Sequence, residues 1–399
     1  MAEELATTDI IEQKLDQAAG KLKELDIDAW ITCVQETSSG AERIFSYISP
    51  GHLTWESAVV VTKEGKRYVI LGEFDQQVFE ASKLYDEVIT FVQDFNEPFT
   101  KLLSRLAPGT IALNYSLEDP MADGVTHGRF LGLEALIKKT LPSARIVPAE
   151  KIITSLVSRK SPIERDHIQR AVDITVKIFD EITAFIRVGR SEKETYDFIQ
   201  ERFAERNLKP SFETLVFAGD RGVGMGHGTA TGNDFRPGDL VHVDMGVFVE
   251  GYASDMQRTW YLLRDGEDTA PEEAIRGFNT IIEAIAESGK ILKPGVTGVE
   301  VDAVARGIVT AAGFPEYPHG LGHQIGRNVH DGAAMLGPAW PRYKSTPMIT
   351  IEADQIFTLE PSLTVPGYGA VGVEEDVIVT PGGAQYMAEP QRELIYIRR

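Results

Sequence analysis

The first part of the chain alternates between helical and strand-like spacing of its apolar residues. Residues 8–25 carry apolar positions three and four apart, which predicts an amphipathic helix. Short runs rich in apolar and β-branched residues follow at Ala29–Cys33, Ala58–Thr62, Tyr68–Leu71, Val88–Val92 and Thr110–Asn114. Helical patterns at 74–83 and 97–106 lie between these runs, and Glu64-Gly65-Lys66 is typical of a hairpin turn. The alternation predicts an α/β domain over residues 1–155.

Three capping boxes mark helix starts in the rest of the chain. Each has Ser or Thr at the N-cap and Glu three residues later: Ser161–Glu164, Ser191–Glu194 and Thr297–Glu300. We expect these helices to end near Phe185, Arg206 and Ala312, and a further helix over 275–289. Strand-like segments follow each pair of helices. The pattern predicts a second domain over residues 160–399, of α+β class, with two related helix-helix-hairpin halves.

Two acidic residues are expected to meet in the first half of this domain. Asp244 and Asp255 lie in β-type runs with Glu250-Gly251 between them. If the hairpin reverses at Val249/Glu250, cross-strand partners have numbers that sum to 499, as 244 and 255 do. Directly opposed side chains have Cβ atoms about 4.5–5.5 Å apart. Two ionised carboxylates so close repel each other unless a cation lies between them.

The second half repeats this arrangement. The residue numbers of Glu360 and Glu374 sum to 734. If the two acids are cross-strand partners, the chain reverses at Gly367, in the turn-forming Pro366–Gly369. Alternation directs Glu375 to the opposite face and Asp376 to the face of Glu374. Apolar neighbours indicate that these strands are buried, where unpaired acids are rare. The two acidic pairs therefore predict a cation site.

Histidines cluster around the same segments. Five of the eight lie between residues 227 and 330: His227, His242, His319, His323 and His330. Two glycines in His319–His323 disfavour a helix, so the even spacing predicts that both imidazoles share one face of an extended segment. His242 shares the face of Asp244, either as a packing residue or as support for a ligand.

Composition and charge exclude several classes of function. The 399 residues are 43% hydrophobic and 25% charged, as in ordinary soluble globular proteins. A net charge of −20 excludes nucleic acid and anionic membranes as partners. The acidic start of the chain is unlike a signal peptide, and no apolar run approaches the ~20 residues of a membrane span. The single cysteine, Cys33, excludes an intrachain disulfide and suits a reducing cytoplasm.

These motifs together resemble a known family. The residues and motifs that carry the resemblance are His227, VHVDMG with Asp244, SDMQRTW with Asp255, HGLGHQIGRNVHD with His323, TLEPS with Glu360 and GVEED with Glu374. The chain resembles the dinuclear metallopeptidases of the pita-bread fold. That family includes methionine aminopeptidases, Xaa-Pro aminopeptidases and Xaa-Pro dipeptidases (prolidases). The resemblance spans about 160–399. Residues 1–155 resemble the creatinase-type N-terminal domain, which favours the Xaa-Pro peptidases.

The resemblance implies a ligand set and a reaction. Asp244, Asp255, His323, Glu360 and Glu374 would bind two divalent ions, with Asp255 and Glu374 bridging. Such an oxygen-rich site suits Mn²⁺, with Co²⁺ or Zn²⁺ as alternatives. A hydroxide that bridges the ions would attack the Xaa-Pro peptide bond, with Glu360 as general base.

The resemblance also implies how substrate is bound. His330 and His227 resemble the family residues that stabilise the tetrahedral intermediate and hold the substrate, and His319 resembles one that lines the proline pocket. A prolidase also needs a cation for the free carboxylate of its substrate, for which Arg342 and Arg327 are candidates. The family further suggests a homodimer in which a neighbour's N-terminal domain helps to close the cleft.

Two positions depart from the family pattern. Gly372 stands where the last motif usually has Arg, and Thr364 stands where an aromatic residue is usual. The five ligands are retained, so hydrolysis of Xaa-Pro dipeptides remains the first hypothesis. The alternatives are an Xaa-Pro aminopeptidase that acts on longer peptides, a non-hydrolytic pita-bread binding protein, and a creatinase-like hydrolase of another C–N bond.

Overall fold

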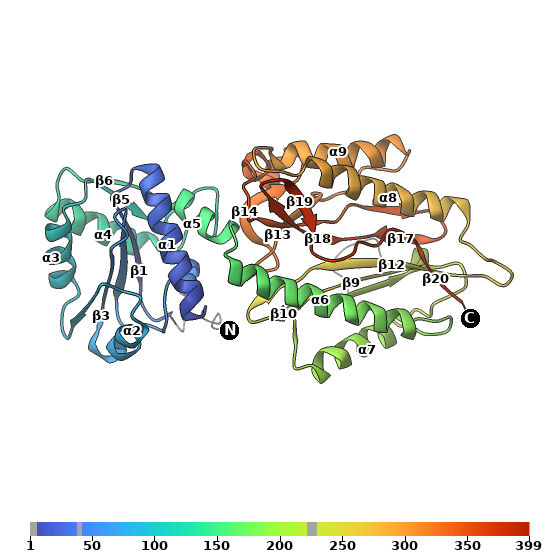
Figure 1. Ribbon diagram of the computed structural model, residues 1–399, viewed down its shortest axis with the longest axis horizontal. Coiled ribbons are helices and arrows are strands. Elements are labelled where there is room, and N and C mark those ends of the chain that lie inside the picture. The colour runs from blue at the N-terminus through green and yellow to red at the C-terminus, as the bar shows by residue number, and fades with distance from the viewer. Residues whose placement is uncertain (1–5, 38–41, 222–229, 399) are drawn as a thin grey trace. The chain divides into compact units, whose positions relative to one another are not determined.

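The computed structural model describes residues 6–37, 42–221 and 230–398 (Figure 1). The chain divides into two compact units, one up to Val157 and one from Ser158 onward. Among the described residues, no helix is both long and apolar enough to cross a membrane.

The N-terminal unit contains one six-stranded sheet with helices packed against it. Its helices are α1 (Thr8–Leu25), α2 (Gln76–Ser82), α3 (Asn96–Leu106), α4 (His127–Thr140) and α5 (Glu150–Ser158). Its strands are β1 (Ala29–Val34), β2 (Ser57–Thr62), β3 (Arg67–Gly72), β4 (Glu87–Phe91), β5 (Thr110–Leu113) and β6 (Arg145–Pro148). The strand order is β4-β3-β2-β1-β5-β6. Short 3-10 turns at Arg43–Tyr47 and Glu73–Asp75 complete the unit.

Local sequence signals determine much of this unit. Strands β2 and β3 pair antiparallel, and Gly65 in the predicted turn between them has a φ of +84°, which costs glycine little. Phe99 and Leu103 of α3 pack with Leu133 and Ile137 of α4 in one apolar core. That core also contains the alternate residues of the central strands, such as Ile31 of β1.

The C-terminal unit begins with two helices and a group of strands. These are α6 (Pro162–Phe185), α7 (Glu192–Glu205), β7 (Lys209–Pro210), β8 (Leu215–Ala218), β9 (Leu240–Met245), β10 (Val247–Val249), β11 (Tyr252–Ala253) and β12 (Met256–Leu262). Two further helices follow, α8 (Glu272–Ile291) and α9 (Gly298–Ala311). The remaining strands are β13 (Gly322–Gln324), β14 (Asp331–Leu336), β15 (Ile356–Leu359), β16 (Ser362–Val365), β17 (Gly369–Gly372), β18 (Glu375–Thr380), β19 (Gly383–Tyr386) and β20 (Ile395–Ile397).

Strands occupy the middle of this unit and helix pairs cover them. Helices α6 and α7 lie on one side of the strands, and α8 and α9 lie on the other (Figure 1). The larger sheets have the orders β20-β12-β9-β8 and β14-β13-β15-β18-β19. Helix pair followed by strands thus occurs twice, as the sequence predicts.

The three predicted capping boxes all form. Ser161 accepts a hydrogen bond from the Glu164 amide at the start of α6, and the Glu164 carboxylate accepts one from the Ser161 amide. Ser191 begins α7 in the same way, and Thr297 begins α9. Each box satisfies amide groups that the first helical turn leaves without partners, which is why these helix starts are readable from sequence.

Candidate metal centre

Asp244 and Asp255 lie on one face of the first hairpin, but they are not directly opposite each other. In the β9–β12 ladder Asp244 pairs with Gln257, so cross-strand numbers sum to 501. The predicted sum of 499 is wrong because the reversal lies one residue later, at Glu250-Gly251. Both turn residues have positive φ, +50° and +77°, as a two-residue type I′ turn requires. Asp255 is therefore a diagonal neighbour of Asp244.

Glu360 and Glu374 keep the register that the sequence predicts. Leu359 pairs with Glu375 on one side of them, and Ser362 pairs with Gly372 on the other. Both pairs sum to 734. The reversal centres on Gly367, whose φ is +81°, so the predicted Pro-Gly turn does determine this register.

Gln257 connects the two hairpins. Its backbone amide donates to the Glu374 backbone carbonyl at 3.4 Å, and the Glu374 backbone amide donates to the Gln257 backbone carbonyl at 3.2 Å. Buried Arg258 donates to the same two carbonyls and forms an ion pair with Glu375 at 3.0 Å. Two segments more than a hundred residues apart in sequence are held together at this point.

The result is a cluster of possible metal donors. Atoms of Asp255, His323 and Glu374 lie within 4.8 Å of one another. His323 Nε2 is 3.6 Å from Asp255 Oδ2 and 3.4 Å from Glu360 Oε1. Asp244 belongs to the same electrostatic group, because its charge raises the pKa of Glu360. All five residues that the resemblance names thus interact within one cluster.

Burial makes this cluster unfavourable without a cation. Asp255 and Glu374 are 6% and 1% exposed. Burial first, and repulsion by neighbouring carboxylates second, raise the pKa of Asp244, Asp255, Glu360 and Glu374. Within the described chain, Asp244 Oδ1 and Glu374 Oε2 are buried without a hydrogen-bond partner. Unpaired, mutually repelling oxygens are what a divalent cation satisfies, so the donor set fits such an ion.

The surroundings of His323 keep its imidazole neutral. Burial and the charge of His330 lower the pKa of His323 to about 3. Its ring lies 4.3 Å from that of His330, edge to face. Its backbone amide donates to Thr358 Oγ1 at 3.1 Å, which holds β13 against β15. A neutral imidazole is the form that coordinates metals.

Asp376 contacts one of the predicted ligands. Its carboxylate accepts a hydrogen bond from the Asp255 amide at 3.2 Å, in agreement with the prediction that it shares the face of Glu374. Glu375 points to the other face and pairs with Arg258, as alternation predicts.

The other predicted histidines have different surroundings. His319 is held between the Gly320 carbonyl, 2.8 Å from Nδ1, and the Ser362 hydroxyl, 2.7 Å from Nε2. Its ring lies 5.1 Å from that of Tyr317. His242 is buried and stacks on Phe217. His227 lies outside the described residues.

The two candidate arginines are placed differently. Arg342 donates to the Pro318 carbonyl and, at 3.0 Å, to the Tyr343 hydroxyl, and its charge acts on His319. Arg327 lies 5.6 Å from the ring of Tyr252, whose hydroxyl donates to Glu164 of α6. Arg342 is therefore the arginine whose contacts lie beside a predicted substrate residue.

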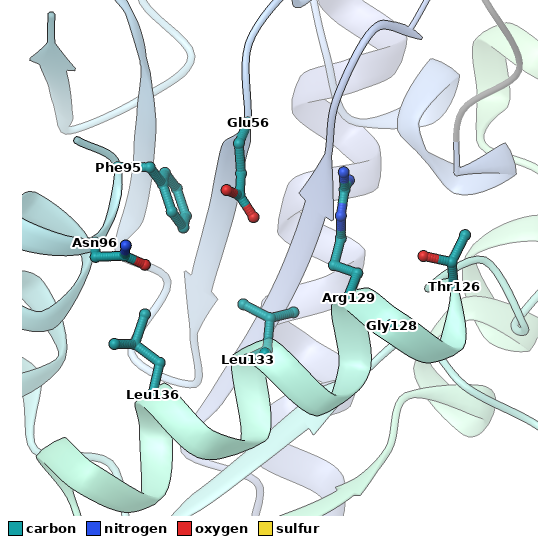
Figure 2. Close-up of a pocket in the computed structure, with 9 residues that line it drawn as sticks. Glu56, Phe95, Asn96, Thr126, Gly128, Arg129, Leu133 and Leu136 are labelled. Carbon is teal, nitrogen blue, oxygen red and sulfur yellow. The ribbon is translucent and has the colours of Figure 1, made fainter. Parts of the chain in front are cut away.

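A pocket of about 370 Å³ lies in the N-terminal unit and contains none of the predicted site residues. Figure 2 shows Glu56 and Arg129 along it, with Phe95, Leu133 and Leu136 forming apolar walls. Arg129 already donates to Gln35 at 3.0 Å. We assign no function to this pocket.

Comparison with protein families adds a decisive observation. The model of metallopeptidase family M24 matches residues 166–381, just over half of the chain and the whole segment that carries the acidic and histidine cluster. This chain belongs to metallopeptidase family M24. M24 members are metallopeptidases, so the expected family is confirmed.

Individual M24 relatives extend the likeness to the full length. An uncharacterized peptidase of Staphylococcus saprophyticus is 29% identical over 379 residues, 93% of this chain and 97% of the relative. The solved Xaa-Pro dipeptidase of Bacillus anthracis is 24% identical with a TM-score of 0.72, covering 97% of this chain and 100% of its own. An X-Pro aminopeptidase of Thermotoga maritima is also 24% identical, with a TM-score of 0.67 and coverage of 96% and 99%. These likenesses confirm the predicted α+β, pita-bread fold preceded by an N-terminal α/β domain.

Both departures from the M24 pattern can be located in the structure. Thr364 of β16 is exposed. At Gly372, a Cβ atom would lie 2.6 Å from Gln257 Oε1 and 2.6 Å from His242 Cε1, so the space is already filled. The sequence analysis did not identify Gln257 as the residue that joins the two hairpins. The available signal was its position two residues after Asp255, because alternation places both side chains on one face.

Proposed function

We propose that this M24 metallopeptidase hydrolyses the peptide bond before proline and acts as an Xaa-Pro dipeptidase (prolidase). The observation that carries the proposal is the approach of Asp255, His323 and Glu374 donor atoms within 4.8 Å, with Asp244 and Glu360 alongside. Likeness to a solved Xaa-Pro dipeptidase and a solved X-Pro aminopeptidase supports the substrate class.

We propose all five residues as ligands of two divalent ions, with Asp255 and Glu374 bridging. Four carboxylates and one imidazole form a hard donor set that favours Mn²⁺ over thiol-preferring ions, with Co²⁺ and Zn²⁺ as alternatives. Two such ions lower the pKa of a shared water and polarise a carbonyl oxygen.

Glu360 is our candidate general base. Its side chain is 20% exposed, against 8% for Asp255, so it is the more accessible of the two carboxylates. Burial raises its pKa, which suits a group that accepts a proton from water and delivers it to the leaving proline nitrogen. The 3.4 Å approach of His323 Nε2 to Glu360 Oε1 keeps the carboxylate beside the other ligands.

The remaining predicted residues would hold substrate. His330, beside His323, would stabilise the tetrahedral intermediate, and His227 would assist it. His319, fixed by Ser362 and the Gly320 carbonyl, would line the proline pocket. Arg342 would bind the substrate's free carboxylate, because its guanidinium lies beside this pocket. Arg327 is the weaker candidate, since its contacts are with Tyr252.

Comparative hydrolysis tests this proposal. Leu-Pro and Leu-Pro-Ala are each incubated with Mn²⁺-loaded protein and with chelated protein. Cleavage of Leu-Pro alone, lost on chelation, supports a prolidase whose cleft reads the free carboxylate. Faster release of leucine from the tripeptide instead supports an Xaa-Pro aminopeptidase with an open cleft. Failure to cut either peptide with metal bound contradicts both and favours a binding protein or a hydrolase of another bond.

We further propose a cytoplasmic homodimer. The buried thiol of Cys33, the chain's single cysteine, supports a reducing compartment, and the dimer follows from the family resemblance. Sedimentation of the purified protein tests the dimer independently of activity.

A further inference from the structure

Asp302 and Arg306 form a buried ion pair on helix α9. Arg306 Nε lies 2.7 Å from Asp302 Oδ2, and Arg306 Nη2 lies 2.8 Å from Asp302 Oδ1, so the guanidinium binds both carboxylate oxygens. The two residues are 1% and 8% exposed. Desolvation offsets much of the attraction within a buried pair, so the contacts that the pair makes with the rest of the protein indicate what it does.

Both members of the pair bind backbone groups around His319. Arg306 Nη1 donates to the Tyr317 carbonyl at 2.8 Å, and Arg306 Nη2 donates to the His319 carbonyl at 2.7 Å. Asp302 Oδ1 accepts a hydrogen bond from the Leu321 amide at 3.0 Å. The backbone before, at and after His319 is therefore held to helix α9 by one ion pair.

The Arg306 guanidinium also packs against two aromatic rings. It lies 4.1 Å from the centroid of the Tyr317 ring and 5.0 Å from that of the Trp340 ring. The Arg342 guanidinium lies 4.6 Å from the same Trp340 ring. Cations are attracted to the faces of aromatic rings, so Trp340 connects Arg306 to the arginine that we propose for the substrate carboxylate.

The metal-binding side of this segment is held by other contacts. The Glu360 backbone amide donates to the Leu321 carbonyl at 2.8 Å. The His323 backbone amide donates to Thr358 Oγ1 at 3.1 Å. Neither bond involves Arg306, so weakening the contacts of Arg306 should displace the substrate-binding residues and leave the metal-binding residues in place.

We propose that Asp302 and Arg306 are positioning residues for substrate binding. They hold His319 and Arg342 in the geometry that receives the proline end of the substrate. Arg reaches its acceptors with nitrogens in a fixed plane, whereas Lys offers one ammonium group on a flexible stem, so position 306 requires Arg. The inference rests on the proposed function for the roles of His319 and Arg342.

Arg306→Lys tests the proposal, because it keeps a positive charge beside Asp302 and removes the planar guanidinium. With Mn²⁺-loaded protein, KM for Leu-Pro is expected to rise about tenfold or more, the effect of losing a hydrogen bond to a charged group. The kcat value, and Mn²⁺ affinity measured by titration calorimetry, should stay close to those of the wild type. Hydrogen exchange of peptides that cover Leu321 should become faster.

Two further variants keep the test decisive. Asp302→Asn retains an oxygen acceptor and weakens the ion pair, so it should raise KM in the same direction by a smaller factor. Arg276→Lys is the matched control, because Arg276 of α8 also donates to a backbone carbonyl, that of Ala312, at 2.8 Å and lies 4.7 Å from the Phe314 ring. It should change neither KM nor the exchange of Leu321.

The outcomes distinguish the inference from the proposed function. Unchanged KM in Arg306→Lys overturns the inference, and so does a fall in kcat at unchanged KM, because the pair would then act on the metal side. Equal effects in Arg276→Lys also overturn it. A wild type that cleaves no Xaa-Pro peptide contradicts the proposed function alone. Exchange then decides the inference: faster exchange at Leu321 in Arg306→Lys alone supports positioning, and unchanged exchange overturns it.

Discussion

Asp244 lies directly opposite Gln257 across the β9–β12 ladder, and Asp255 lies two residues before Gln257 on the same face. The first acid is thus paired with an uncharged residue, and the second acid is its diagonal neighbour. This stagger reduces direct repulsion between the two carboxylates, since diagonal neighbours are farther apart than opposed ones. It also leaves Asp255 free to approach His323 and Glu374.

Replacing Asp255 by Asn is expected to reduce metal-dependent turnover by roughly a hundredfold or more, because a proposed bridging oxygen loses its charge. The chelated variant should be more stable than chelated wild type, because one buried repelling charge is removed. Turnover and thermal midpoints with and without Mn²⁺ measure both effects. Asp197→Asn, at an exposed ion pair with Lys193, is the control. Unchanged turnover in Asp255→Asn would contradict the proposed site.

Chelation should cost more stability as the pH rises. Without metal, the folded-state pKa values of Asp244, Asp255 and Glu374 are raised above their unfolded values. Their favourable contribution is therefore complete below about pH 4 and is lost as the pH rises through the folded pKa values. Bound Mn²⁺ removes this penalty and adds about 2.7 kcal/mol at a hundred times its Kd. Thermal unfolding with Mn²⁺ or chelator at pH 5 and pH 8 should show a widening gap. A constant gap would argue against buried ligand carboxylates.

Glu42 should make the N-terminal unit less stable at alkaline pH. Burial, opposed in part by interactions with Asn114 and Ile44, raises its pKa to about 8 from an ordinary value of 4.5. Its contribution to stability is complete below about pH 4.5 and is lost as the pH rises through 8. At 1.36 kcal/mol per pKa unit, a shift from 4.5 to about 8 corresponds to about 5 kcal/mol.

Glu42→Gln is expected to remove most of this dependence. Hydrogen exchange of the N-terminal unit at pH 6 and pH 9 measures the difference between variant and wild type. Glu64→Gln, in the turn before β3, is the matched control. Equal pH dependence in wild type and Glu42→Gln would show that the carboxyl is not buried as described.

Lys160 and Asp331 form an ion pair whose side chains are 1% and 0% exposed, with a 2.8 Å contact. Lys160→Met leaves a buried carboxylate without its cation and is expected to cost about 3–5 kcal/mol. Lys193→Met, which breaks the exposed pair with Asp197, should cost about 0–1 kcal/mol. Urea unfolding compares the two. Similar losses would indicate that the buried pair is not intact in solution.

Arg342→Ala is expected to raise KM for Leu-Pro by about 10- to 100-fold, the effect of losing a hydrogen bond to a charged group. The KM for Leu-Pro-Ala should change much less, because its proline has no free carboxylate. Arg327→Ala is the matched control, since that side chain contacts Tyr252. Steady-state kinetics with both peptides gives the answer. An equal rise for both peptides would place Arg342 outside carboxylate recognition.

Local signals predicted a large part of the architecture. The capping boxes at Ser161, Ser191 and Thr297 were correct because a helix N-terminus is satisfied by neighbours within three residues. The register around Gly367 was correct because Pro-Gly determines where the chain reverses. The register around Glu250 was wrong by one residue in the turn, since a non-glycine residue at positive φ is hard to anticipate.

The sequence by itself predicted which residues would carry the chemistry, because acids in apolar strands with histidines near them have few roles other than holding a cation. Only the tertiary structure decided how they meet. The contact between Gln257 and Glu374 joins segments more than a hundred residues apart, and no periodicity within either segment encodes it. The role of Gly372 likewise depends on what surrounds it, because a missing side chain acquires meaning only from the groups that fill its space.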